Sequence, residues 1–183
     1  MKNKFVVTLL VIGGIVLLNF LASFVFFRLD LTEEKRYSLS DATKSLLENL
    51  AEKDSADVFV KVYLDGDELP AGFERLKRAV TETLEEFKIY GGTNIEYKFI
   101  NPNAETDTKK REEFYMELAK KGMNPTQIVD NKNGRQVETI IFPYALVSVA
   151  GKEVPVLLLK GTQGKTADEK LNQSYENVEY ELA

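Results

Sequence analysis

Three acidic side chains, Asp65, Asp67 and Glu68, stand together directly after an apolar segment. Their carboxylates could offer oxygen ligands to a calcium ion, which is bound by such groups in proteins. The EF-hand pattern is absent, however, and acidic residues are common in turns. We therefore expect a solvated turn here and no metal site.

A second segment with chemical potential is GTQGKT, residues 161–166. It resembles the end of a phosphate-binding loop, in which backbone amides wrap the phosphates of a nucleotide. The loop motif needs an earlier glycine, and Leu159 stands in its place. We expect a flexible connector at 161–166 and no nucleotide cofactor.

The composition argues against catalysis, because the chain has no cysteine and no histidine. It can form neither a disulfide nor a thiolate nucleophile, and it lacks the commonest metal ligand and general base. The net charge is −5, which is a poor match for nucleic acid. We expect a protein that is not an enzyme, holds no cofactor or metal and binds no nucleic acid.

The N-terminus is expected to contain a transmembrane helix over residues 5–27, a run without an ionisable side chain. The tail at 1–4 carries Lys2 and Lys4, so the positive-inside rule places it in the cytoplasm. A cleaved signal peptide is the rival interpretation, but its apolar region is usually shorter. We expect a single-pass protein of the inner membrane, in contact with lipid, with the bulk of the chain periplasmic.

Three residues of this run could contact a partner helix. Gly13 and Gly14 would allow close approach, and Asn19 could form a hydrogen bond within the membrane. A lone anchor would tolerate the same residues equally well, and the spacing is not that of a G-x-x-x-G motif. Both interpretations remain open.

Residues 28–56 are expected to form a juxtamembrane linker with a short amphipathic helix at 40–52. The segment from Ser38 to Asp41 has the form of a capping box, and apolar residues then recur on one face. This helix would join the anchor to the folded domain.

Residues 57–160 have the pattern of an α/β domain. The predicted order is a strand at 58–64, a helix with an apolar stripe from Phe73 to Phe87, a strand at 95–100 and a second helix that Asp107 can cap. Two hairpins follow, with strands at 127–129 and 136–141 and then at 144–149 and 154–159. Pro155 predicts that the last strand lies at a sheet edge, because proline cannot donate to a ladder. Residues 161–183 are expected to be a loop and, at 167–171, the start of a helix in a truncated chain.

The order strand, helix, strand, helix, antiparallel hairpin, helix is that of the thioredoxin fold, βαβαββα. Phe142-Pro143 stands before a core strand, where thioredoxin-like folds resemble one another in carrying a cis-proline, so Pro143 is predicted to be cis. The active cysteines of thioredoxins follow the first strand, and residues 65–72 here contain none. A degenerate thioredoxin-like enzyme is therefore disfavoured.

Several stretches resemble one known family. They are RLDLTEEKRYSLSDATKSLLENL at 28–50, DNKNGRQVETIIFPYALVSVAGKEVPVLLL at 130–159 and LNQSYENVEYELA at 171–183. The chain is similar in them to the GldG family, gliding-motility-associated auxiliary proteins of an ABC transporter. Family members continue to a further region and a C-terminal span, which are missing here.

The resemblance implies an accessory subunit that associates with separate ABC permease and ATPase subunits and supports gliding and secretion. A periplasmic ligand-binding module of the transporter is the alternative. A closed apolar pocket with a few polar groups would favour ligand binding, whereas a flat apolar patch would favour protein docking.

Overall fold

The computed structural model describes residues 4, 7, 10–17, 39–52, 57–67, 69–132, 135–160 and 167–183. The chain divides into two compact units, Met1–Ser38 and Leu39–Ala183. Each unit is described by itself.

The first unit corrects the prediction of a transmembrane helix. Its described residues, 4, 7 and 10–17, are helical. Among the described residues, no helix is long and apolar enough to cross a membrane. The prediction of a membrane-spanning helix at 5–27, and of a single-pass inner-membrane protein, is therefore wrong on this finding. Of that range, all positions other than 7 and 10–17 lie outside the described residues.

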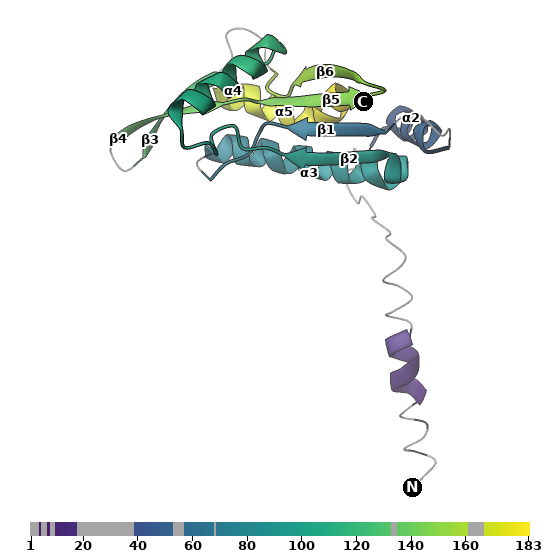
Figure 1. The fold of residues 1–183 in the computed structure, drawn as a ribbon. Helices are drawn as coiled ribbons and strands as arrows, with labels where there is room; N and C mark the ends of the chain where they lie inside the picture. The colour runs from purple at the N-terminus through teal and green to yellow at the C-terminus, as the bar shows by residue number, and fades with distance from the viewer. Residues whose placement is uncertain are drawn as a thin grey trace. The chain divides into compact units, whose positions relative to one another are not determined.

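The second unit is α/β, and its order of strands and helices agrees with the prediction (Figure 1). Its elements are α2 (Asp41–Glu52), β1 (Val58–Val62), α3 (Ala71–Gly91), the 3-10 helix η1 (Gly92–Asn94), β2 (Ile95–Phe99), α4 (Thr108–Lys120), β3 (Thr126–Lys132), β4 (Arg135–Ile141), β5 (Tyr144–Val149), β6 (Lys152–Leu157) and α5 (Ala167–Leu182).

Four strands form the main sheet in the order β2-β1-β5-β6. β1 and β2 are parallel, whereas β5 is antiparallel to both β1 and β6. Pro155 lies in β6 at one edge of this sheet, which confirms the prediction for that residue. β3 and β4 pair only with each other, and Figure 1 shows their hairpin extending beyond the end of the main sheet.

Helices α3 and α5 pack against one face of the main sheet. The apolar stripe predicted along α3 is buried there, and α5 adds Leu171 and Val178. Because alternate residues of a strand point to the same face, Val60 and Val62 meet these helices. The buried residues of this core are Val60, Val62, Leu64, Phe73, Leu76, Val80, Leu84, Ile141, Ala145, Leu158, Leu171 and Val178.

Helix α4 contributes to a second, smaller core, which includes Leu146 of β5 and the residues that follow β1. Leu118 of α4 packs there with Tyr63 and Phe142, and the Tyr115 and Phe142 rings are 5.0 Å apart. The buried members are Tyr63, Leu118, Met123, Phe142 and Leu146. This core lies near the carboxyl end of β1.

The ends of α4 follow the local signals of the sequence. The Asp107 carboxylate accepts hydrogen bonds from the backbone N–H groups of Lys109 and Lys110 at 2.9 and 3.3 Å, which confirms the predicted N-cap. Gly122 ends the helix with φ +86°, and the Met123 N–H donates to the Leu118 carbonyl at 3.0 Å. That bond is the Schellman pattern expected at a glycine stop.

The compact unit Leu39–Ala183 is wider than the domain predicted at 57–160. α2 is part of this unit, because Leu47 packs against Phe87 of α3 in a third core cluster. α5 continues to Leu182, well past the short helix predicted at 167–171, and its buried side chains complete the main core. The linker helix and the C-terminal helix are therefore structural parts of one domain.

Candidate functional site

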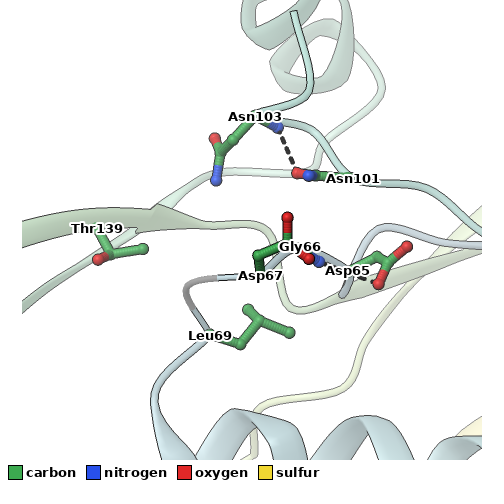
Figure 2. A pocket seen from close by; sticks show the side chains of 7 residues that line it. All are labelled: Asp65, Gly66, Asp67, Leu69, Asn101, Asn103 and Thr139. Carbon is green, nitrogen blue, oxygen red and sulfur yellow. Dashed lines mark hydrogen bonds between the residues drawn. The ribbon is translucent and has the colours of Figure 1, made fainter.

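A polar pocket of about 280 Å³ lies where β1 and β2 end. Its lining residues come from the loop after β1, the loop after β2 and strand β4 (Figure 2): Asp65, Gly66, Asp67, Leu69, Asn101, Asn103 and Thr139. β1 and β2 are parallel, so their carboxyl ends meet at the same edge of the sheet. Ligands of α/β proteins commonly bind outside that edge.

Asp65 is held in place at the start of the first loop. Its carboxylate accepts a hydrogen bond from the Lys77 ammonium of α3 at 2.6 Å and one from the Gly66 N–H at 3.0 Å. The bond to Asp65 raises the pKa of Lys77, so the ammonium stays charged. Gly66 has φ +142°, and a Cβ there would lie 3.2 Å from the Asn101 Oδ1. The loop after β1 therefore needs a glycine to approach the loop after β2.

Hydrogen bonds of Asn101 and Asn103 hold the loop after β2 in place. The Asn101 Oδ1 accepts a hydrogen bond from the Asn103 N–H at 2.8 Å, which Figure 2 draws as a dashed line. The Asn103 side-chain amide donates to the Ile140 carbonyl of β4 at 3.0 Å and accepts from the Tyr115 hydroxyl of α4. Burial raises the pKa of Tyr115, so its hydroxyl stays a donor near neutrality.

The arrangement leaves one acidic side chain free to bind a ligand. Asp65 is neutralised by Lys77, and the side chain of Asn103 is engaged by β4 and α4. Asp67 is exposed and forms no hydrogen bond with another described residue, so its carboxylate is free to accept one from a ligand. In the part of the chain that the structure describes, no group of three or more acidic, histidine or cysteine side chains could hold a metal ion.

The predicted contact residues of the N-terminal unit form no site with described neighbours. A Cβ at Gly13 or Gly14 would meet nothing within 4 Å. Asn19 lies outside the described residues. The prediction that these residues contact a partner helix depended on the transmembrane helix, which the described residues do not support.

The prediction of a cis-proline at Pro143 is wrong. The described residues contain no cis peptide bond, so Phe142-Pro143 is trans. Pro143 is buried, and its carbonyl accepts a hydrogen bond from the Leu158 N–H at 2.8 Å. The loop at 161–166 and Glu68 lie outside the described residues.

The sequence pattern predicted a solvated turn at Asp65 and Asp67 and no pocket. It assigned no role to Asn101, Asn103 or Thr139. The signal that could have found Asn101 is its place directly after a strand parallel to β1. Nothing in the local sequence of Thr139 shows that β4 reaches this edge.

Comparison with known proteins identifies a family without assigning a function. No curated protein and no solved structure matches the chain. The comparison with thioredoxins therefore rests on the order of elements alone. The model of one family, described as a domain of unknown function, DUF7088, matches residues 33–148. That match covers more than half of the chain, so the protein belongs to the DUF7088 family.

Proposed function

We propose that this protein is a non-catalytic accessory subunit of an ABC transporter linked to gliding motility or secretion. In this role it associates with a separate permease and a separate ATPase. The proposal is supported by the resemblance of the stretches at 28–50, 130–159 and 171–183 to the GldG family. The chain contributes binding and positioning, and ATP hydrolysis takes place on another subunit.

The side chains of the polar pocket are the observation that favours a non-catalytic role. Thioredoxins carry their active cysteines after the first strand, and Asp65-Gly66-Asp67 occupies that place here. Asp65 is paired with Lys77, and the described part of the pocket contains no nucleophile in contact with a base. An adjacent base is one of the common ways in which a nucleophile is activated for covalent catalysis.

A ligand-binding module of the transporter is the second candidate. The pocket favours it, since the Asp67 carboxylate and the Thr139 hydroxyl line one cavity. Small-molecule pockets are usually about 300–1,000 Å³ and mostly apolar, and this cavity is smaller and polar. Its ligand would be a compact molecule with ammonium or hydroxyl donors.

The test is to purify the tagged full-length chain from its own cells in mild detergent. We expect the permease and the ATPase to co-purify, and the isolated chain to show no ATP hydrolysis. A preparation that contains neither subunit would contradict the transporter proposal.

The two candidates are separated by the double variant Asp67→Ala/Asn101→Ala, with Glu112→Ala on the exposed face of α4 as the matched control. An accessory docking role predicts that both variants keep the complex and support gliding or secretion. If only the pocket variant loses transport while the complex remains intact, the ligand-binding module is the correct function.

A further inference from the structure

The two edges of the main sheet differ in their capacity to accept another strand. β6 forms one edge, and Pro155 removes a backbone donor from it. β2 forms the other edge and contains no proline. An edge with a full set of backbone groups is a template for pairing with another chain.

The free backbone groups of β2 can be identified from its bonds to β1. The Ile100 N–H donates to the Val62 carbonyl at 2.8 Å, so the backbone groups of Ile100 point toward β1. Directions alternate along a strand, and the backbone groups of Tyr97 and Phe99 therefore point away from β1. These groups are available to a new neighbouring strand.

The side chains of β2 are self-complementary about Tyr97. If two copies of β2 pair antiparallel with Tyr97 opposite its equivalent, Glu96 of each copy lies opposite Lys98 of the other. Ile95 then lies opposite Phe99 on the other face. Glu96 and Lys98 are both exposed, and neither forms an ion pair with a described residue.

The same register also gives hydrogen-bond partners to the backbone groups of β2 that point away from β1. Tyr97 stands at the centre as a hydrogen-bonded pair, in which each copy donates its N–H to the carbonyl of the other.

We propose that the β2 edge is an interface for a second copy of this chain. Two copies pair antiparallel through β2 about a two-fold axis at Tyr97, and their main sheets join into one continuous sheet. The cross-strand pairs between Glu96 and Lys98 set the register. This interface is independent of the proposed transporter function and of the polar pocket.

The test is a charge exchange in the full-length chain, measured as molar mass by light scattering during size-exclusion chromatography. Glu96→Lys or Lys98→Glu alone places like charges opposite each other at two points, and we expect the dissociation constant of the dimer to rise at least about tenfold. An equimolar mixture of the two variants restores opposite charges at both points and should recover the dimer. Glu112→Lys, on α4, is the matched control and should leave the dimer unchanged.

The register is tested by a single cysteine, because the native chain has none. Tyr97→Cys lies opposite itself on the axis and should form a disulfide-linked dimer on mild oxidation, since paired Cα atoms are close enough for the bond. Thr93→Cys lies away from the axis and should not. A native chain that is monomeric throughout the concentration range, or a dimer that persists in both single charge variants, would overturn the proposal.

Discussion

The two cores that cover the main sheet, one with α3 and α5 and one with α4, are built differently. The core of α3 and α5 is almost entirely apolar and takes residues from β1, β5 and both helices. The core of α4 is smaller, and polar contacts adjoin it, such as the Tyr115 hydroxyl that donates to Asn103. The polar pocket opens near this second core, where β1 and β2 end and the loops after them begin.

The α3–α5 core supplies most of the stability of the fold, whereas the α4 core adjoins the pocket. Continuous apolar burial supplies most of the free energy of folding. The polar side chains of the pocket contribute little to that burial. Substitutions in the α3–α5 core should therefore lower the free energy of unfolding most, and substitutions of these polar side chains should lower it least.

The largest effect is expected from a chain that ends at residue 148, where the family match ends. It would lack β6, the antiparallel partner of β5, and α5, whose Leu171 and Val178 complete the main core. We expect no cooperative unfolding transition and a narrow dispersion of amide signals in the proton NMR spectrum.

The control for this truncation is residues 39–183, a compact unit by itself, which should remain folded. A cooperative transition in the chain that ends at residue 148 would show that the α4 core can hold the sheet alone.

Local features of this fold were predictable from the sequence, and long-range partners were not. The spacing of Leu76, Val80 and Leu84 is enough to predict a helix that packs on a sheet. The side chain of Asp107 is enough to predict the N-cap of the next helix. The choice of partner for α2 and α5 depends on tertiary packing, which no local pattern encodes. The pocket was not predicted for the same reason, since β4 supplies Thr139 from a distant part of the chain.

The transmembrane prediction rested on the length of the apolar run at 5–27. Among the described residues, no helix is long and apolar enough to cross a membrane.

A smaller effect is expected from single Leu→Ala substitutions, one in each of these two cores. Leu84 of α3 and Leu118 of α4 are both fully buried, and Leu→Ala in a core costs about 2–5 kcal/mol. We expect Leu84→Ala near the upper end of that range and Leu118→Ala near the lower end, because a smaller core with neighbouring loops can relax into the cavity.

The measurement is the free energy of unfolding in urea, with Leu46→Ala on the exposed side of α2 as the control. Leu46 is 50% exposed, so its variant should lose about 0.5 kcal/mol or less. Equal losses at Leu84 and Leu118 would mean that the two cores are equally rigid.

A still smaller loss is expected from the N-cap of α4. Asp107→Ala removes the acceptor for two backbone N–H groups and should reduce the free energy of unfolding by about 1 kcal/mol. Glu112→Ala, on the same helix and exposed, is the control and should have almost no effect. If both variants lose the same amount, the cap does not stabilise α4.

The smallest effect concerns the contact between α2 and α5, and it depends on pH. Burial alone would raise the pKa of Glu179, but hydrogen bonds from Thr43 and Ser40 outweigh it and hold that pKa below its usual value. The Ser40 N–H donates to the Glu179 carboxylate at 2.8 Å at the start of α2. A carboxyl group with a lowered pKa in the folded state stabilises the fold above its unfolded pKa, and the stabilisation is lost as the pH falls through the folded pKa.

We therefore expect Glu179→Gln to lower the free energy of unfolding by about 0.5–1 kcal/mol at neutral pH, with a smaller loss in acid, where the native carboxyl group is protonated as well. Urea unfolding at neutral pH and at a pH below the usual value for a glutamate measures this difference. Glu176→Gln, on an exposed position of the same helix, should show no such dependence. If the loss from Glu179→Gln were the same at both pH values, the carboxylate charge would not contribute, and α2 would be held to α5 by apolar packing alone.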